Sequence, residues 1–102
     1  MAKILPTALP AEAGLELAER VRTLRLDREW PRAVLAERSG VSEGTIKLFE
    51  TRGQITLSRL LLLARALDAL GDFDALFVPR VAKTLAEIET RERRRQRGRR
   101  RS

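Results

Sequence analysis

The stretch RAVLAERSGVSEGTIKLF, residues 32–49, contains two short amphipathic segments joined by a Ser-Gly turn. Gly40 stands at the turn, where glycine adopts a positive φ without a steric penalty. Ser42 is a favourable N-cap for the second segment, because its hydroxyl accepts a hydrogen bond from an otherwise unpaired backbone N–H. Val41, just before the cap, and Ile46, four residues into the segment, form the pattern of a hydrophobic staple. The stretch therefore predicts two short helices joined by a tight turn.

The second predicted helix spans about Glu43 to Glu50 and has one apolar and one polar side. Ile46 and Phe49 lie three residues apart and are expected to face the core, and Ala36 in the preceding helix is small enough to let another helix approach closely. The outer side then carries polar or small residues: Glu43, Gly44 and Lys47, with Thr45 at its edge. Two helices arranged in this way are typical of a helix-turn-helix, in which the second helix lies in the major groove of DNA.

The net charge of +7 is concentrated at one end of the 102-residue chain. Residues 1–79 contain eleven Lys or Arg and eleven Asp or Glu, whereas residues 80–102 contain ten Lys or Arg and three Glu. The charge excess therefore lies entirely in the tail. A strongly basic tail indicates a polyanionic partner, and nucleic acid is the first candidate.

The chain contains no cysteine and no histidine. This excludes disulfides, thiolate metal sites, the usual nucleophile–base pairs and nearly all zinc sites. The carboxylates are scattered along the predicted helices, so neither an enzyme nor a metal or cofactor is expected. No apolar run reaches about 18 residues, and the N-terminus lacks a signal-peptide pattern. We therefore expect no membrane segment and a cytoplasmic, nucleoid-associated location.

Three parts are predicted along the chain: an extended N-terminal arm (1–12), a single domain (13–79) and a basic tail (80–102). The first helix of the domain is expected from about Ala13 to Arg25, with Leu17, Val21 and Leu24, and Ala18 beside them, as a buried stripe. Trp30 follows this helix and is expected to pack in the core; the alternative is an exposed aromatic that binds a ligand.

The remaining elements are predicted from caps and apolar spacing. Thr56 is the expected N-cap of a leucine-rich helix that ends near Leu70. A short helix from Asp72 to Phe77 is expected to close the core with its apolar side chains, which are Phe73, Leu76 and Phe77. Residues 81–95 have an amphipathic pattern, and RERRRQRGRRRS (91–102) is expected to be disordered in free solution.

A resemblance to a known family rests on these residues. Residues 32–49, with Ala36, Gly40, Ile46 and Phe49 in register, resemble the helix-turn-helix of the XRE (phage-repressor-like) transcriptional regulators. The flanks also fit: LAERVRTLRLDREW precedes the motif, and LFETRG and a leucine-rich run ending in LARAL follow it. The resemblance covers about Ala13 to Phe77. It implies an all-α, five-helix, lambda-repressor-like DNA-binding domain, here with an N-terminal arm and a basic C-terminal tail.

The resemblance also implies which residues contact DNA. The resemblance places five residues at or near base edges or flanking phosphates: Ser42, Glu43, Gly44, Thr45 and Lys47. By its chemistry, Glu43 is suited to accept from a cytosine amino group, Lys47 to donate to guanine or a phosphate, and Thr45 to contact a thymine methyl or a phosphate. Without a donor, Glu43 would repel phosphates.

Other candidates for phosphate contacts lie beside these residues. The loop after the recognition helix offers Thr51, Arg52 and Gln54, which would position the protein without specifying sequence. Where the family more often has a Ser/Thr-Gln pair, this chain has Pro31 and Arg32. Arg32 is a candidate for a phosphate contact as a cation; the alternative is a solvated surface arginine.

A narrower resemblance concerns the ends of the chain. The Pro-containing arm, the DALFVP exit from the domain and the arginine-rich end resemble HipB-type antitoxins. This resemblance implies a homodimer on operator DNA that represses its own operon and binds a HipA-like kinase toxin. Two other classes remain open: a non-specific DNA- or RNA-binding protein that depends on its tail, and an adaptor whose domain binds another protein.

Overall fold

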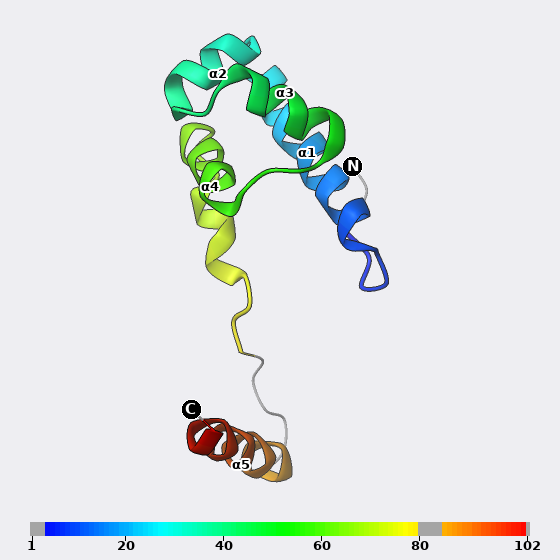
Figure 1. Ribbon diagram of the computed structural model, residues 1–102, viewed down its shortest axis with the longest axis vertical. Coiled ribbons are helices and arrows are strands. Elements are labelled where there is room, and N and C mark those ends of the chain that lie inside the picture. The colour runs from blue at the N-terminus through cyan, green and yellow to red at the C-terminus, as the bar shows by residue number, and fades with distance from the viewer. Residues whose placement is uncertain (1–3, 80–84, 102) are drawn as a thin grey trace.

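The computed structural model describes residues 4–79 and 85–101 of the chain, and these residues form helices and no strands (Figure 1). The domain contains four α-helices: α1 (Pro10–Asp27), α2 (Arg32–Ser39), α3 (Glu43–Arg52) and α4 (Leu57–Ala66). A 3-10 helix, η1 (Leu70–Ala75), follows, and α5 (Leu85–Arg101) lies in the basic tail. The all-α prediction is therefore confirmed for the described residues.

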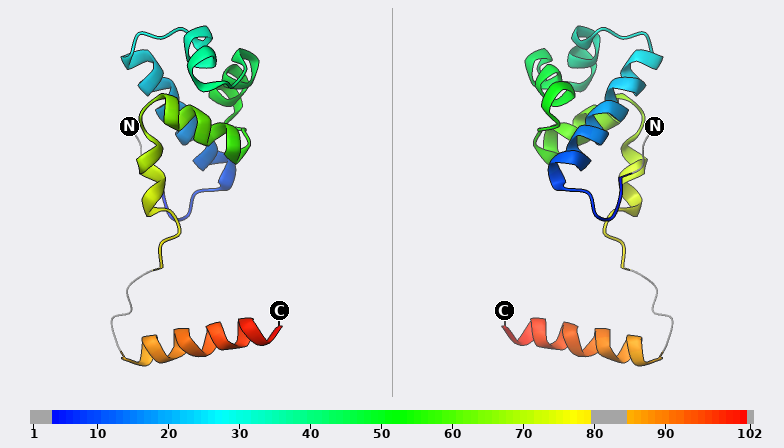
Figure 2. Two further views of the ribbon diagram at one scale, coloured as in Figure 1. Left: turned by 90° about the vertical axis from the view of Figure 1, so that its left-hand side faces the viewer. Right: turned by 90° about the vertical axis from the view of Figure 1, so that its right-hand side faces the viewer.

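The helices of the domain enclose a small core. α3 packs against α1 and α2, and α2 also packs against α4, so the four helices gather around one centre (Figure 1; Figure 2). The core is formed by buried side chains from the four helices, from the turn before α3 and from the C-cap of α4: Ala18, Leu35, Val41, Ile46, Phe49, Leu63 and Leu67. Trp30 packs against this cluster and is partly buried, as predicted.

The turn between α2 and α3 has the expected geometry. Gly40 caps α2 with a φ of +80°, and its N–H donates to the Ala36 carbonyl at 2.9 Å. The Ser42 hydroxyl accepts from the Thr45 N–H at 3.1 Å. Val41 and Ile46 are both buried in the core. These local rules therefore define the start and the orientation of α3.

A close approach between α1 and the end of α3 was not anticipated. A Cβ on Gly14 would lie 2.6 Å from the Gly53 carbonyl oxygen, and a Cβ on Gly53 would lie 2.6 Å from the Leu15 backbone nitrogen. Gly53 also has a φ of +70° and caps α3. Only a pair of glycines allows the two backbones to come this close, so the pair fixes the spacing between α1 and α3.

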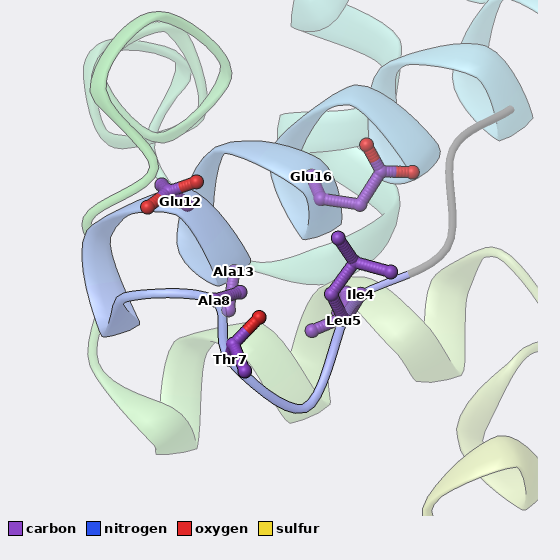
Figure 3. A pocket seen from close by; sticks show the side chains of 7 residues that line it. All are labelled: Ile4, Leu5, Thr7, Ala8, Glu12, Ala13 and Glu16. Atoms are coloured by element: carbon purple, nitrogen blue, oxygen red, sulfur yellow. The ribbon is translucent and has the colours of Figure 1, made fainter.

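The start of the chain differs from the prediction. α1 begins at Pro10 rather than Ala13, because proline suits the first helical position and the Glu12 carboxylate accepts from the Leu9 N–H at 3.3 Å. The segment before it turns at Pro6–Thr7 rather than running straight (Figure 3). The buried stripe of α1 is also rotated. Ala18 is buried and Val21 packs against the core, as predicted, but Arg25 is buried too, whereas Leu17 and Leu24 lie at the margin, each 37% exposed.

The end of the domain differs as well. α4 starts after its N-cap Thr56, as predicted, but ends at Ala66, because Asp68 adopts a φ of +57°. The helix expected over Asp72–Phe77 is a 3-10 helix that ends at Ala75. Phe73 is partly buried, but Leu76 is exposed and Phe77 is 98% exposed, so the prediction that both close the core is wrong.

The tail contains a longer helix than expected. Residues 91–101 belong to α5, so the expectation of disorder for them is wrong. Arginine is a good helix former. Ion pairs also support the helix, with Arg93 Nη2 3.9 Å from Glu89 Oε2 and Arg95 Nη1 3.7 Å from Glu92 Oε2. Of the amphipathic segment predicted over 81–95, residues 81–84 lie outside the described residues.

Candidate nucleic-acid interface

The first half of α3 presents a polar surface opposite the core. Ile46 and Phe49 are buried on one side of the helix, while Glu43, Gly44 and Lys47 are exposed on the other and Thr45 is half-buried at the edge. This is the division that the sequence predicts. The helix is thus fixed to the domain on one side, and its other side is accessible to a macromolecular partner.

Two hydroxyl groups at the start of α3 are connected to each other. The Ser42 Oγ accepts from the Thr45 N–H and donates to the Thr45 Oγ1 at 2.8 Å. This connection holds both side chains in defined rotamers. The Thr45 methyl group and the Ser42 hydroxyl are therefore presented at fixed positions beside the exposed Glu43.

The three candidates predicted in the loop after the recognition helix are all exposed, but the loop prediction is wrong for Thr51 and Arg52, because α3 continues to Arg52 and only Gln54 lies beyond it. The Thr51 hydroxyl donates to the Lys47 carbonyl at 2.7 Å, so a phosphate contact from this hydroxyl requires that bond to break. The side chains of Arg52, the last residue of α3, and of Gln54, just beyond Gly53, make no hydrogen bond with the described residues. Arg52 and Gln54 are thus the two candidates here whose donors are not already used.

Arg32 is engaged in a cluster that the sequence did not predict. Its Nε donates to Glu50 Oε1 at 3.0 Å, and the Arg25 Nε and Nη2 donate to the two oxygens of the same carboxylate at 2.8 and 2.9 Å. The Glu50 side chain is 1% exposed and that of Arg25 is 7% exposed, but that of Arg32 is 34% exposed. Arg25 Nη1 also donates to the Trp30 carbonyl at 2.9 Å. We call Arg25, Arg32 and Glu50 the carboxylate cluster.

The carboxylate cluster is electrostatically favourable for a charged Glu50. Burial raises the pKa of the Glu50 carboxyl, but the hydrogen bonds and positive charges of Arg25 and Arg32 outweigh this and place the pKa below its ordinary value of 4.5. The cluster joins α1, the start of α2 and α3. Among the described residues, no buried side-chain polar atom lacks a hydrogen-bond partner.

The spacing of the sequence contained a signal for this cluster. Arg25 stands seven residues after the buried Ala18, and Glu50 stands four residues after Ile46 and one after Phe49. Both therefore lie on the buried sides of their helices, where unpaired charges are almost never found. Two opposite charges at buried positions predict a buried ion pair. This signal is easily missed, because charged residues by themselves suggest exposed positions.

Trp30 lies next to the cluster and between the first two helices. The guanidinium carbons of Arg28 and Arg38 lie over its ring, 5.2 and 4.6 Å from the centroid, which are distances typical of cation–π contacts. Arg28 also donates to the Leu67 carbonyl at 2.7 Å, at the end of α4. The ring is therefore covered by cations and by the core rather than presented to a ligand.

Away from α3, a hollow of about 190 Å³ lies between the N-terminal segment and α1 (Figure 3). Its two carboxylates are already used, because Glu12 accepts from Leu9 and Glu16 accepts from Arg20 at 3.2 Å. No cluster of acidic or other metal-ligating side chains that could hold a metal occurs within the described residues. Within the same residues, no helix is both long and apolar enough to cross a membrane.

Comparison with known proteins agrees with this geometry. Residues 21–70 match a family model described as "Helix-turn-helix"; the match begins within α1, contains all of α2, α3 and α4, and ends at the first residue of η1. A search of curated proteins found no match to the chain. The matched family consists of DNA-binding regulator domains and is not an enzyme family. Residues 21–70 are therefore a helix-turn-helix domain of the XRE family of DNA-binding regulators.

Proposed function

We propose that the protein is a sequence-specific transcriptional repressor that inserts α3 into the major groove of an operator. The observation that carries the proposal is the division of α3, with Ile46 and Phe49 buried on one side and a polar surface on the other. A rigid helix with such a surface, in a domain of this family, suits the major groove, which is wide enough to admit an α-helix.

The residues of this surface have distinct proposed roles. Glu43 accepts from a cytosine amino group, Lys47 donates to guanine or to a phosphate, and Thr45 contacts a thymine methyl or a phosphate. Gly44 lets the backbone of α3 approach the DNA closely. Phosphates at either side of the groove are contacted by Arg32, Ser42, Thr51, Arg52 and Gln54, which position the helix without reading sequence.

The repressor is proposed to act as a homodimer that binds two half-sites about one helical turn apart. Support comes from apolar side chains that are exposed in the last residues of the domain: Leu70, Leu76, Phe77 and Val78. Exposed apolar surface of this kind is typical of protein–protein contacts. Phe77 is the strongest candidate for the centre of such a contact because nearly its whole side chain is accessible.

The tail is proposed to add affinity without adding specificity. The arginines of α5 at positions 91, 93, 94, 95 and 97 are spaced so that they cover more than half of the circumference of the helix. This favours contacts with phosphates. Each such contact makes the binding more sensitive to salt, because it adds about −0.9 to the slope of log K against log salt concentration. The same arrangement favours the second candidate function, a non-specific DNA- or RNA-binding protein that depends on its tail.

The finer part of the proposal is that the repressor controls its own operon as the antitoxin of a HipA-like kinase toxin, in the cytoplasm and associated with the nucleoid. Its support is the resemblance of the arm, the DALFVP exit and the arginine-rich end to HipB-type antitoxins. The test is co-expression with a kinase-like protein encoded beside this gene. We expect the pair to co-purify and the growth arrest caused by the kinase to be relieved; free kinase and unrelieved arrest would refute the antitoxin role.

Binding to DNA upstream of the protein's own gene, compared with scrambled DNA over a salt series, tests the repressor. Three proteins are compared with the wild type: residues 1–79, the Glu43→Ala/Lys47→Ala variant, and Glu19→Ala/Arg22→Ala as a control. The control removes an exposed pair of opposite charges from α1, with the same change in net charge.

We expect residues 1–79 to prefer their own DNA with a lower salt dependence, the α3 variant to lose the preference, and the control to keep it. Equal binding of both DNAs, with no binding by residues 1–79, would favour the non-specific protein instead. No binding above that of any basic protein at physiological salt would favour the adaptor.

A further inference from the structure

We infer that Glu50 is a positioning residue, which holds the Arg32 guanidinium beside α3 as a preoriented clamp for a DNA phosphate. The inference rests on the proposed function and extends it to a buried residue that does not itself face DNA. It makes Arg32 neither a solvated arginine nor a mobile cation. It also explains why a carboxylate inside the domain has two arginine partners rather than one.

The carboxylate cluster has an excess positive charge that a partner can reach at only one side chain. Two guanidinium groups share one carboxylate, so the cluster carries one uncompensated positive charge. Arg25 is 7% exposed, and its Nε and both terminal nitrogens are used by Glu50 and the Trp30 carbonyl. The excess charge is therefore accessible to a partner only through Arg32.

The hydrogen bonds leave the outer part of Arg32 available. Glu50 is bound through Nε, and the terminal nitrogens of Arg32 make no hydrogen bond within the described part of the chain. These nitrogens carry four of the five N–H donors of a guanidinium. Paired N–H groups of this kind match the geometry of a phosphate. One side of the guanidinium thus binds the protein, and the other suits an anion.

The position of Arg32 suits a phosphate beside the major groove. The groove is about 12 Å wide, so a helix inside it has a phosphate backbone on either side. Arg32 lies at the flank of α3, because its Nε is 3.0 Å from the carboxylate of a residue in that helix. A phosphate bound there would be held at a fixed place relative to α3, which sets the register in which Glu43 and Lys47 meet the bases.

Substitution by lysine separates a held guanidinium from a mere positive charge. Lysine keeps the charge, but its single ammonium group lacks the second pair of donors that projects beyond Glu50. Arg52 provides the matched control, since it is exposed at the end of α3 and has no such tether. We compare Arg32→Lys and Arg32→Gln with Arg52→Lys and Arg52→Gln in the full chain, measuring operator affinity from 50 to 200 mM salt.

We expect Arg32→Lys to lose the contact as completely as Arg32→Gln, whereas Arg52→Lys behaves like the wild type. Losing one phosphate contact lowers the salt slope by about 0.9, so over this range the wild type loses roughly 3.5-fold more affinity than either Arg32 variant. Thermal melts check that each variant is folded. A merely structural role for Arg32 would change the melts and leave the slope unchanged.

Glu50 itself is tested in a second background. In a Glu50→Gln protein, below its melting temperature, Arg32→Lys should cost no further affinity because neither side chain is held. The inference would be overturned if Arg32→Lys cost the same affinity in both backgrounds. It would also be overturned if Arg32→Lys or Arg32→Gln kept the salt slope of the wild type. If Glu50→Gln fails to fold, the comparison of the Arg32 variants with the Arg52 variants decides whether the inference holds. If the wild type binds operator and scrambled DNA equally, the proposed function fails, and the Arg32 slopes still decide the inference on either DNA.

Discussion

Replacing Gly53 with alanine should destabilise the domain considerably more than replacing Gly40, although both glycines cap helices with a positive φ. Their φ values are +70° and +80°, so an alanine at either site costs about 1–2 kcal/mol of backbone strain. The surroundings differ. Nothing lies within 4 Å of a Cβ on Gly40, whereas a Cβ on Gly53 meets three backbone atoms of Gly14 and Leu15 at 2.6–3.0 Å.

The steric part of the Gly53→Ala cost follows from which atoms are met. Backbone atoms of α1 cannot rotate away as a flexible side chain can, so α1 and the end of α3 must separate. Overpacking of this kind typically costs about 1–3 kcal/mol. Adding the strain gives a total of about 2–5 kcal/mol for Gly53→Ala, against about 1–2 kcal/mol for Gly40→Ala.

Urea unfolding of the full chain, followed by circular dichroism at 222 nm, measures both variants. We expect lower midpoints with unchanged m-values, since a changed midpoint at constant m reports stability. In thermal melts each kcal/mol corresponds to about 4–8 °C for a domain of 60–100 residues. Equal losses for the two variants would refute the reasoning, because strain alone would then account for both glycines and the close approach of α1 to α3 would carry no cost.

Three further predictions concern stability, DNA contact and assembly. Glu50→Gln should cost about 3–5 kcal/mol, because it leaves Arg25 and Arg32 without their buried counter-charge. In the wild type, the stabilisation by ionised Glu50 should be fully present above pH 4.5, the ordinary pKa of this group, and be lost as the pH falls through its lower folded pKa, because the unfolded chain binds the proton more readily. Urea melts at several pH values should show this fall in the free energy of unfolding for the wild type and not for the variant. Gly44→Ala, with open space around its Cβ, should stabilise α3 by about 0.5–1 kcal/mol yet weaken operator binding in a gel-shift assay, and unchanged binding would show that the backbone of α3 does not approach the bases. Phe77→Ser should shift a dimer towards monomer in sedimentation without lowering the melting temperature, and an unchanged sedimentation profile would exclude Phe77 from the interface.

Local rules were sufficient to predict the central motif. The cap at Ser42, the turn at Gly40 and the staple of Val41 with Ile46 each depend on residues within a few positions of one another. Short-range interactions of this kind are the same in any fold, so the sequence alone identifies them. The exposed side of α3 follows directly, because burying Ile46 and Phe49 determines which residues remain outside.

The features that were missed depend on contacts between distant segments. Glu50 meets Arg25 and Arg32 across 25 and 18 positions, and its identity as a charged residue suggests exposure until those partners are placed. Gly14 is an ordinary helix residue until Gly53 is brought against it. Phe77 was expected in the core on hydrophobicity alone, but η1 ends before it and the chain leads it away from the core.

The cations around Trp30 have a practical consequence for optical measurements. The chain has one tryptophan and no tyrosine, and none of its aromatic residues lies in α5. Indole emission from the unlabelled protein therefore originates at one ring, between the first two helices and beside Arg28 and Arg38. Opening of the domain would expose this fluorophore to water, whereas melting of α5 would leave its spectrum unchanged and reduce only the helical dichroism. Fluorescence and circular dichroism together thus distinguish unfolding of the helix-turn-helix domain from melting of α5 without cutting the chain.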